Sequence, residues 1–134
     1  AQVMRVAAAA ARHRVPLTVR GGGTGNYGQC VPLQGGVVLD VTKLDRVLGI
    51  TPGRVVCEAG ARIGRVEEAA AETGQMLSMF PSTKRLATMG GFIAGGSGGI
   101  GSLRHGMLRD GGNVSYLRIV TVEEGWPQAG PGAE

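Results

Sequence analysis

The chain has 134 residues, of which 43% are hydrophobic and 18% charged, so its size and composition suit one small globular domain. The formal net charge is +4, but the basic residues form no stripe and aromatic residues make up only 4% of the chain, which argues against a nucleic-acid partner and favours a small anionic ligand. No apolar run is long enough to cross a membrane, and in the absence of a targeting signal we expect a cytoplasmic location.

Hydrophobic periodicity and turn residues predict an α+β fold without a regular alternation of strands and helices. The predicted elements, in chain order, are a helix at 2–13, strands at 15–19, 37–41, 47–50 and 54–59, a helix at 62–73 and a last strand at 114–122. Residues 1–125 would form the folded domain. Residues 126–134 hold Pro, Gly and Ala without periodicity and would form a disordered tail.

The helix predicted at 62–73 has a clear amphipathic pattern. Ile63, Val66, Ala69, Ala70 and Thr73 share one face, which we expect to be buried, whereas Glu67, Glu68 and Glu72 would face water. Gly74 would end the helix.

The two cysteines, Cys30 and Cys57, stand in or beside apolar runs and lack the spacing of metal ligands. In a reducing cytosol such cysteines are typically buried and unpaired, so we expect free thiols and no disulfide. We also expect no metal site.

The 25 glycines gather in clusters, and the cluster at 21–28 directly follows a predicted strand. Gly23 to Gly28 spell G-x-G-x-x-G, but a dinucleotide fold of the Rossmann type needs a helix to begin in this loop. Pro32 and the Gly35–Gly36 pair prevent that helix. The motif recurs at 96–101, again without a long helix after it, so the Rossmann fold is excluded.

The first Gly-rich loop can still bind an anion. Successive small residues can turn their N–H groups inward to form a nest, to which Arg20 would add charge and Thr24 a hydroxyl donor. A pyrophosphate suits such a nest. The alternative is a turn that merely joins two strands, but such a turn needs one or two glycines, and residues 21–28 contain five.

A second region combines hydroxyl groups, apolar residues and glycines. Pro81, Ser82 and Thr83 supply a bend and two hydroxyls, and 88–99 mixes apolar side chains with glycines that permit close approach. Such a surface can lie against a flat aromatic ring system and a sugar chain. The alternative is a Gly-rich helix packed tightly on a sheet.

Four segments, at 15–29, 35–50, 81–106 and 113–125, together resemble a known family in order and spacing. They are similar to the FAD-binding domain of the FAD-linked oxidases, the group of vanillyl-alcohol oxidase and p-cresol methylhydroxylase, and most of all to its branch of glycolate oxidases and D-lactate dehydrogenases. The resemblance covers about residues 2–125. It implies a PCMH-type fold of two small α/β subdomains with FAD between them.

The resemblance also implies where FAD would lie. The loop at 20–28 would hold the pyrophosphate, Pro81 to Thr83 would run past the phosphates and the ribityl chain, and the backbone of Val120 would meet the adenine. His105 and Gly106 occupy the place where this branch often has a Tyr-Gly pair. The residues expected at the cofactor are Arg20, Gly21, Gly22, Gly23, Thr24, Gly25, Asn26, Pro81, Ser82, Thr83, Thr88, Gly90, Gly91, Ser97, Gly98, Gly99, His105, Gly106 and Val120.

Some relatives attach FAD covalently through a His in the first Gly-rich loop. No His stands at 20–28 here, so the resemblance implies noncovalent FAD.

The chain is far shorter than members of this branch, and the resemblance implies a domain that is incomplete at both ends. The strand before the first helix, a later Gly-rich segment and the substrate-binding domain have no counterpart. We expect apolar surface made for these parts to be exposed and to favour self-association.

The intact parent would oxidise a small substrate, such as a 2-hydroxy acid, by hydride transfer to FAD. The substrate would bind through a domain absent here, so we name no catalytic residue and expect this chain to be inactive alone. Two alternatives remain. The chain would be a noncatalytic nucleotide- or phosphate-binding module, or an inactive self-associating fragment.

Overall fold

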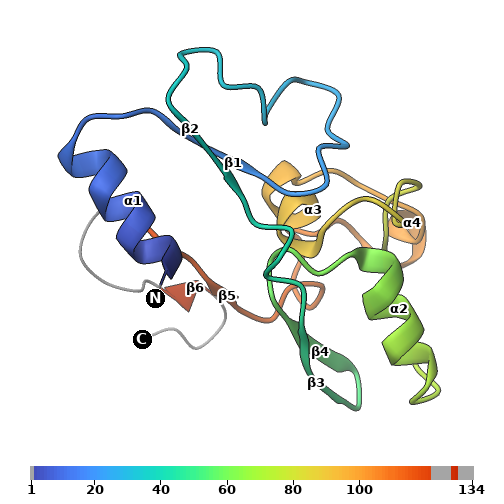
Figure 1. Cartoon of the computed structure of the whole chain (residues 1–134). Helices are drawn as coiled ribbons and strands as arrows, with labels where there is room; N and C mark the ends of the chain where they lie inside the picture. The colour runs from blue at the N-terminus through green and yellow to red at the C-terminus, as the bar shows by residue number, and fades with distance from the viewer. Residues whose placement is uncertain (1, 122–127, 130–134) are drawn as a thin grey trace.

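The structure is a computed structural model and describes residues 2–121 together with the backbone of 128–129 (Figure 1). The elements, in chain order, are α1 (Gln2–Arg12), β1 (Leu17–Arg20), β2 (Val37–Asp40), β3 (Val47–Thr51), β4 (Arg54–Cys57), α2 (Ile63–Ala71), α3 (Met89–Gly95), α4 (Ser102–His105), β5 (Leu117–Arg118) and β6 (Gln128–Ala129). This order confirms the predicted α+β class. Figure 1 shows α1 on one side of β1 and β2, with α2, α3 and α4 together on the other side.

The first helix ends in a left-handed turn. Arg14 has φ 52°, and the N–H of Val15 donates to the carbonyl of Ala10 at 2.9 Å, which is the 6→1 bond of a Schellman motif. Pro16 lacks an N–H and cannot continue a helix. The strand therefore begins at Leu17, two residues later than predicted.

β1 and β2 form a parallel pair in which Leu17 lies opposite Val37 and Arg20 opposite Asp40. Their connection, residues 21–36, contains no helix or strand of its own. Because the strands are parallel, the loop that leaves β1 and the turn that leaves β2 begin at the same edge of the sheet. Ligands of parallel sheets bind at this carboxyl edge.

β3 and β4 form an antiparallel hairpin around Pro52 and Gly53. Gly53 has φ 73°, which favours glycine in such a turn. The guanidinium of Arg46, just before β3, pairs with the carboxylate of Glu58, just after β4, at 2.8 Å. This pair closes the open end of the hairpin.

The core is small and lies around α2 and α3. Ile63, Met79, Ala87 and Phe92 are buried against one another. In α2, Ile63, Val66 and Ala70 are buried, which confirms most of the predicted apolar face, but Ala69 is half-buried and Thr73 is exposed beyond the end of the helix. Glu67 does not simply face water, because it is half-buried and pairs with Lys84.

One prediction needs correction in the second half of the chain. The last strand is restricted to Leu117–Arg118 rather than 114–122, because in the described part of the chain only these two residues find a partner strand, β6. Residues 89–95 form the helix α3, the alternative considered for the second Gly-rich region, although its Phe92 packs against Ile63 of α2 rather than on a sheet.

Cys30 and Cys57 are free thiols, as expected, but both are half-buried rather than buried. Burial raises the pKa of the Cys57 thiol, and the negative charge of Glu58 raises it further. Of the predicted disordered tail, the structure describes only the backbone of Gln128–Ala129, and the remainder lies outside the described residues. Within the described ranges, no helix combines the length and apolar character needed to span a bilayer.

Candidate cofactor site

The two Gly-rich regions meet at the carboxyl edge of the β1–β2 sheet. A Cβ placed on Gly21 would lie 2.2 Å from the hydroxyl oxygen of Thr88, and one placed on Gly22 would lie 2.0 Å from the carbonyl oxygen of Leu86. Real Cβ atoms do not approach that closely, so the backbone contact depends on the absence of side chains at both positions. The fold thus joins two segments that are more than sixty residues apart in the sequence.

The first loop offers backbone donors. Among the residues that the structure describes, none accepts a hydrogen bond from the N–H groups of 21–26. The guanidinium of Arg20 folds over Gly23, with a nitrogen 3.1 Å from the position that a Cβ on Gly23 would take. Unpaired N–H groups beside a guanidinium form a suitable environment for an anion.

Asp40 brings a negative charge to the same edge of the sheet, opposite Arg20. The hydroxyl and the N–H of Thr42 donate to its carboxylate at 2.6 Å and 2.8 Å. These bonds lower the pKa of the Asp40 carboxyl, and the charges of Arg20 and Lys43 lower it further. Asp40 therefore stays ionised, and its carboxylate is bound by Thr42 of the turn that follows β2.

Thr88, expected at the cofactor, has a structural position. Thr88 is only 1% exposed, and its hydroxyl oxygen caps α3 by accepting the N–H of Gly91 at 3.3 Å. The N–H of Gly90 donates to the carbonyl of Ala59 at 2.8 Å. Thr88 and Gly90 thus fix the start of α3, and Gly91 is exposed beside them.

Pro81, Ser82 and Thr83 form a compact turn with the residues that follow. The N–H of Lys84 donates to the carbonyl of Pro81 at 3.1 Å, and those of Leu86 and Ala87 donate to the carbonyl of Thr83 at 2.9 Å. Ser82 and Thr83 remain exposed. No described residue makes a hydrogen bond with either hydroxyl, so both are available to a ligand.

Ser97, Gly98 and Gly99 follow α3 and return towards Phe80. Phe80 and Ile100 exchange two backbone hydrogen bonds, at 2.8 Å and 3.1 Å. A Cβ on Gly99 would lie 2.4 Å from the carbonyl oxygen of Phe80, so Gly99 is required for this contact. Ser97 and Gly98 are exposed.

His105 is exposed at the end of α4, and Gly106 follows with φ 80°. The amide of Asn113 donates to the carbonyls of His105 and Met107 at 2.8 Å and 3.0 Å, and it accepts a bond from Ser78 at 3.0 Å. Asp110 accepts the N–H of Met107 at 2.7 Å. These two side chains hold the turn in which His105 and Gly106 stand.

The remaining expected residues contribute less to this arrangement. Gly25 and Asn26 are exposed in the first loop, where the side chain of Gln29 lies close to Gly25. Val120 is half-buried just beyond β5. Its contact with an adenine stays a prediction.

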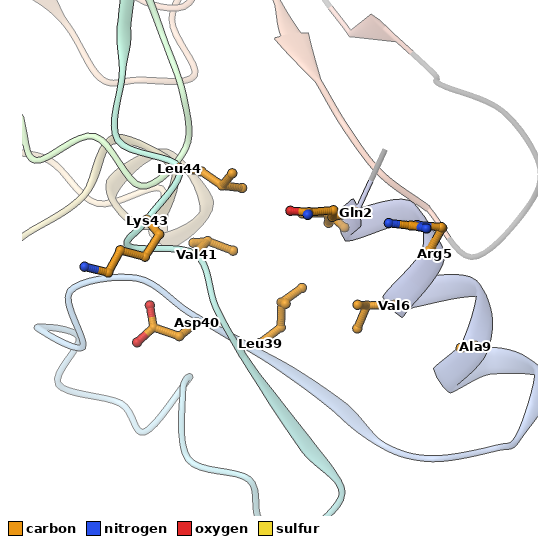
Figure 2. Close-up of a pocket in the computed structure, with 10 residues that line it drawn as sticks. Gln2, Arg5, Val6, Ala9, Leu39, Asp40, Val41, Lys43 and Leu44 are labelled. Atoms are coloured by element: carbon orange, nitrogen blue, oxygen red, sulfur yellow. The ribbon is translucent and has the colours of Figure 1, made fainter.

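A separate hollow of about 640 Å³ lies between α1 and the β2 segment. Figure 2 shows Leu39, Val41 and Leu44 facing Gln2 and Val6 across it. Its lining is mainly apolar, with Arg5, Asp40 and Lys43 at its margin. It contains none of the residues expected at the cofactor, so we do not assign it to that site.

Sequence reasoning missed two side chains that shape the candidate site. Lys84 lies over the ring of Phe80 and pairs with Glu67 of α2, and the sequence gives no signal for the pair with Glu67 because it joins distant residues. Asn113 follows Gly111 and Gly112, and this pattern indicates a turn but not the bonds that the amide makes.

The described residues match the chemistry of FAD. Its diphosphate needs donors and positive charge, and the N–H groups of 21–26 and Arg20 are groups of this kind. Its ribityl chain needs hydrogen-bonding partners, and Ser82 and Thr83 carry exposed hydroxyls. Its ring needs close backbone approach, which the exposed Gly91 and Gly98 permit.

Comparisons with known proteins identify the family of the chain. The family model described as "FAD binding domain" matches residues 1–126. The chain is 35% identical to a D-lactate dehydrogenase of Archaeoglobus fulgidus over 72% of this chain and 22% of that protein. It is 32% identical to the glycolate oxidase subunit GlcD of Escherichia coli over 91% of this chain and 24% of that subunit.

The fold recurs among solved structures. A structure of an alkyldihydroxyacetonephosphate synthase superposes with a TM-score of 0.84 and 24% identity, over 98% of this chain and 25% of that one. The chain thus spans about a quarter of the length of the relatives that it matches. It belongs to the FAD-binding domain family of FAD-linked oxidoreductases, and its cofactor is FAD.

Proposed function

We propose that the carboxyl edge of β1 and β2, together with the turn at 81–87 and the start of α3, forms the FAD site of this chain. The observation that carries the proposal is the contact of Gly21 and Gly22 with Thr88 and Leu86, since it places unpaired N–H donors beside the second Gly-rich region. The diphosphate would lie against 21–26. Ser82 and Thr83 would face the ribityl chain, and Gly91, Ser97, Gly98, His105 and Gly106 the flavin.

The binding would be noncovalent, because no His stands at 20–28 to form a bond to the flavin. The cofactor supplies hydride acceptance, while the residues of this chain hold and orient it. We assign no acid or base to the chain.

The intact protein would oxidise a small 2-hydroxy acid. Two of the relatives are named for D-lactate and glycolate, which are both 2-hydroxy acids. Because the chain covers about a quarter of these relatives, the substrate would bind to residues outside it. A cytoplasmic location stays a prediction. Self-association is a further part of this proposal, supported by large apolar side chains that are exposed in the described residues.

The test is to add FAD to the purified chain, remove free flavin by desalting, and record the visible absorption spectrum. We expect flavin bands that remain with the protein and are released by denaturation. A colourless protein that still binds ADP would instead favour a noncatalytic nucleotide-binding module. A folded protein that binds neither compound would overturn the proposal in favour of an inactive fragment.

A further inference from the structure

Lys84 makes contacts on both sides of the turn that contains Pro81, Ser82 and Thr83. Its ammonium lies 4.3 Å from the centre of the Phe80 ring, and Phe80 is the residue that enters the turn. A cation over an aromatic face is attracted by the electrons of the ring. The contact therefore joins the two residues that flank the turn and closes it around the two exposed hydroxyls.

The same ammonium forms an ion pair with the carboxylate of Glu67 on α2. The side chains of Lys84 and Glu67 are only 35% and 22% exposed, so water screens the pair less than it screens a pair on an open surface. Lys84 thereby fastens the turn to the second turn of α2 as well as to Phe80.

The main chain of this segment is attached to α2 too. The N–H of Gly64 donates to the carbonyl of Lys84 at 2.9 Å, and the N–H of Ile63 donates to the carbonyl of Ala87 at 3.0 Å. The side chain of the N-cap residue Arg62 accepts no hydrogen bond from the start of α2. The carbonyls of Lys84 and Ala87 accept the first N–H groups of the helix instead. Leu86, between them, presents its carbonyl to Gly22 of the first loop.

We propose that Lys84 is a positioning residue for the cofactor. Through its contacts with Glu67 and Phe80, Lys84 holds Ser82 and Thr83 in the orientation needed to meet FAD. This inference rests on the proposed function. It assigns to α2 a role in the site, although no residue of α2 was expected there.

A direct contact between Lys84 and the diphosphate is the competing role. In the structure its ammonium is already paired with a carboxylate and covers a ring. A lysine held in this way contributes rigidity to the turn, whereas the N–H groups of 21–26 have no hydrogen-bond acceptor among the described residues and remain available to the diphosphate.

The experiment compares FAD dissociation constants, measured by flavin fluorescence, for Lys84→Met, Glu67→Gln and the double variant. Each single change should weaken FAD binding about tenfold, because each breaks the same half-buried contact. The double variant should bind no more weakly than either single one, because coupled residues are not additive. Lys84→Arg should retain most of the affinity, since a guanidinium can pair with a carboxylate and stack on a ring.

Glu58→Gln is the matched control, because it breaks an ion pair of the β3–β4 hairpin that does not contact the turn. Its FAD affinity should equal that of the unaltered chain. The inference is wrong if Glu67→Gln keeps full affinity while Lys84→Met loses it, which is the result expected of a direct phosphate contact. If Lys84→Met and Glu67→Gln lower the thermal midpoint of unfolding but leave the FAD affinity unchanged, the role of Lys84 is merely structural and the inference is wrong.

Failure of the unaltered chain to bind FAD would contradict the proposed function. The role of Lys84 in holding the turn can then still be tested by a measurement that needs no FAD. Hydrogen exchange at the backbone amides of Lys84, Leu86 and Ala87, which are bonded within the turn, should accelerate in Lys84→Met and in Glu67→Gln but not in Glu58→Gln. Equal exchange in all four proteins would show that Lys84 does not hold the turn.

Discussion

At the scale of single residues, the site depends on positions where a side chain would not fit. Gly22 faces a backbone carbonyl, that of Leu86, and a carbonyl cannot move aside as the end of a flexible side chain can. Gly21 faces the buried hydroxyl of Thr88, which is already used to cap α3. The two glycines therefore serve the contact between the loops as much as any contact with a ligand.

Gly22→Ala should push the first loop away from Leu86. We expect the free energy of unfolding to fall by about 1–3 kcal/mol, the usual cost of overpacking, and the affinity for FAD to fall with it. Chemical denaturation and a flavin titration would measure the two effects. Gly49→Ala is the control, because no atom lies within 4 Å of a Cβ at Gly49. Equal behaviour of the two variants would mean that the loops are not in contact.

The residue scale also shows where sequence reasoning reached its limit. The first Gly-rich loop could be predicted as an anion site, because a cluster of glycines after a strand is a local pattern. The role of Thr88 could not, because its burial depends on Gly21 and on Ala59 and Ala61, whose carbonyls bind Gly90 and Met89 at the start of α3. Lys84 and Asn113 were missed for the same reason.

At the scale of elements, local pattern predicted α1, α2 and the first four strands to within a few residues. It did not settle α3, where three of seven residues are glycine. Glycine disfavours helix interiors, so this helix is maintained by its cap and by the burial of Phe92. The shortened β5 likewise depends on a partner distant in sequence, the strand β6.

The β3–β4 hairpin should lose stability in acid. Hydrogen bonds from the Arg46 side chain and N–H hold the pKa of Glu58 below its ordinary value of 4.5. A carboxyl with a lowered folded-state pKa stabilises the fold above its unfolded-state pKa, and that contribution disappears as the pH falls through the folded-state pKa. Glu58→Gln should therefore be less stable than the unaltered chain at pH 7, and the difference should shrink below about pH 4.5.

Unfolding in urea at a series of pH values would measure this difference. A gap between the two proteins that stays constant down to pH 2 would show that the carboxylate charge of Glu58 contributes nothing to stability. Asp45→Asn is a suitable comparison, because Asp45 stands next to Arg46 and makes no hydrogen bond through its side chain in the described structure.

At the scale of the whole molecule, apolar packing is uneven. The buried cluster lies around Ile63 and Phe92, whereas the β1–β2 sheet leaves apolar side chains in contact with water. Val19 is 55% exposed and Val37 43% exposed. Because side chains alternate along a strand, Val19 and Val37 lie on the same face of the sheet as Leu39. The helix α1 covers this face only in part, because the hollow lies between α1 and the β2 segment.

We expect this face to drive self-association of the chain. The mean mass from sedimentation velocity should rise with protein concentration, and Val37→Lys should reduce the rise because it places a charge on the face. Leu48→Lys is the control, since Leu48 is 57% exposed on β3 of the separate hairpin. A mass that stays monomeric at all concentrations, or an equal effect of both substitutions, would contradict the prediction.

The way in which α2 begins has a consequence for how the chain folds. Its first N–H groups are bound by the carbonyls of Lys84 and Ala87, about twenty residues further along the chain, and a nine-residue helix is only marginally stable alone. We therefore expect α2 to need the turn at 81–87 in order to form, and the turn to need α2 in order to keep its shape. The helix α2 and this turn should then unfold as one cooperative unit, so a ligand that binds the turn would also stabilise the helix.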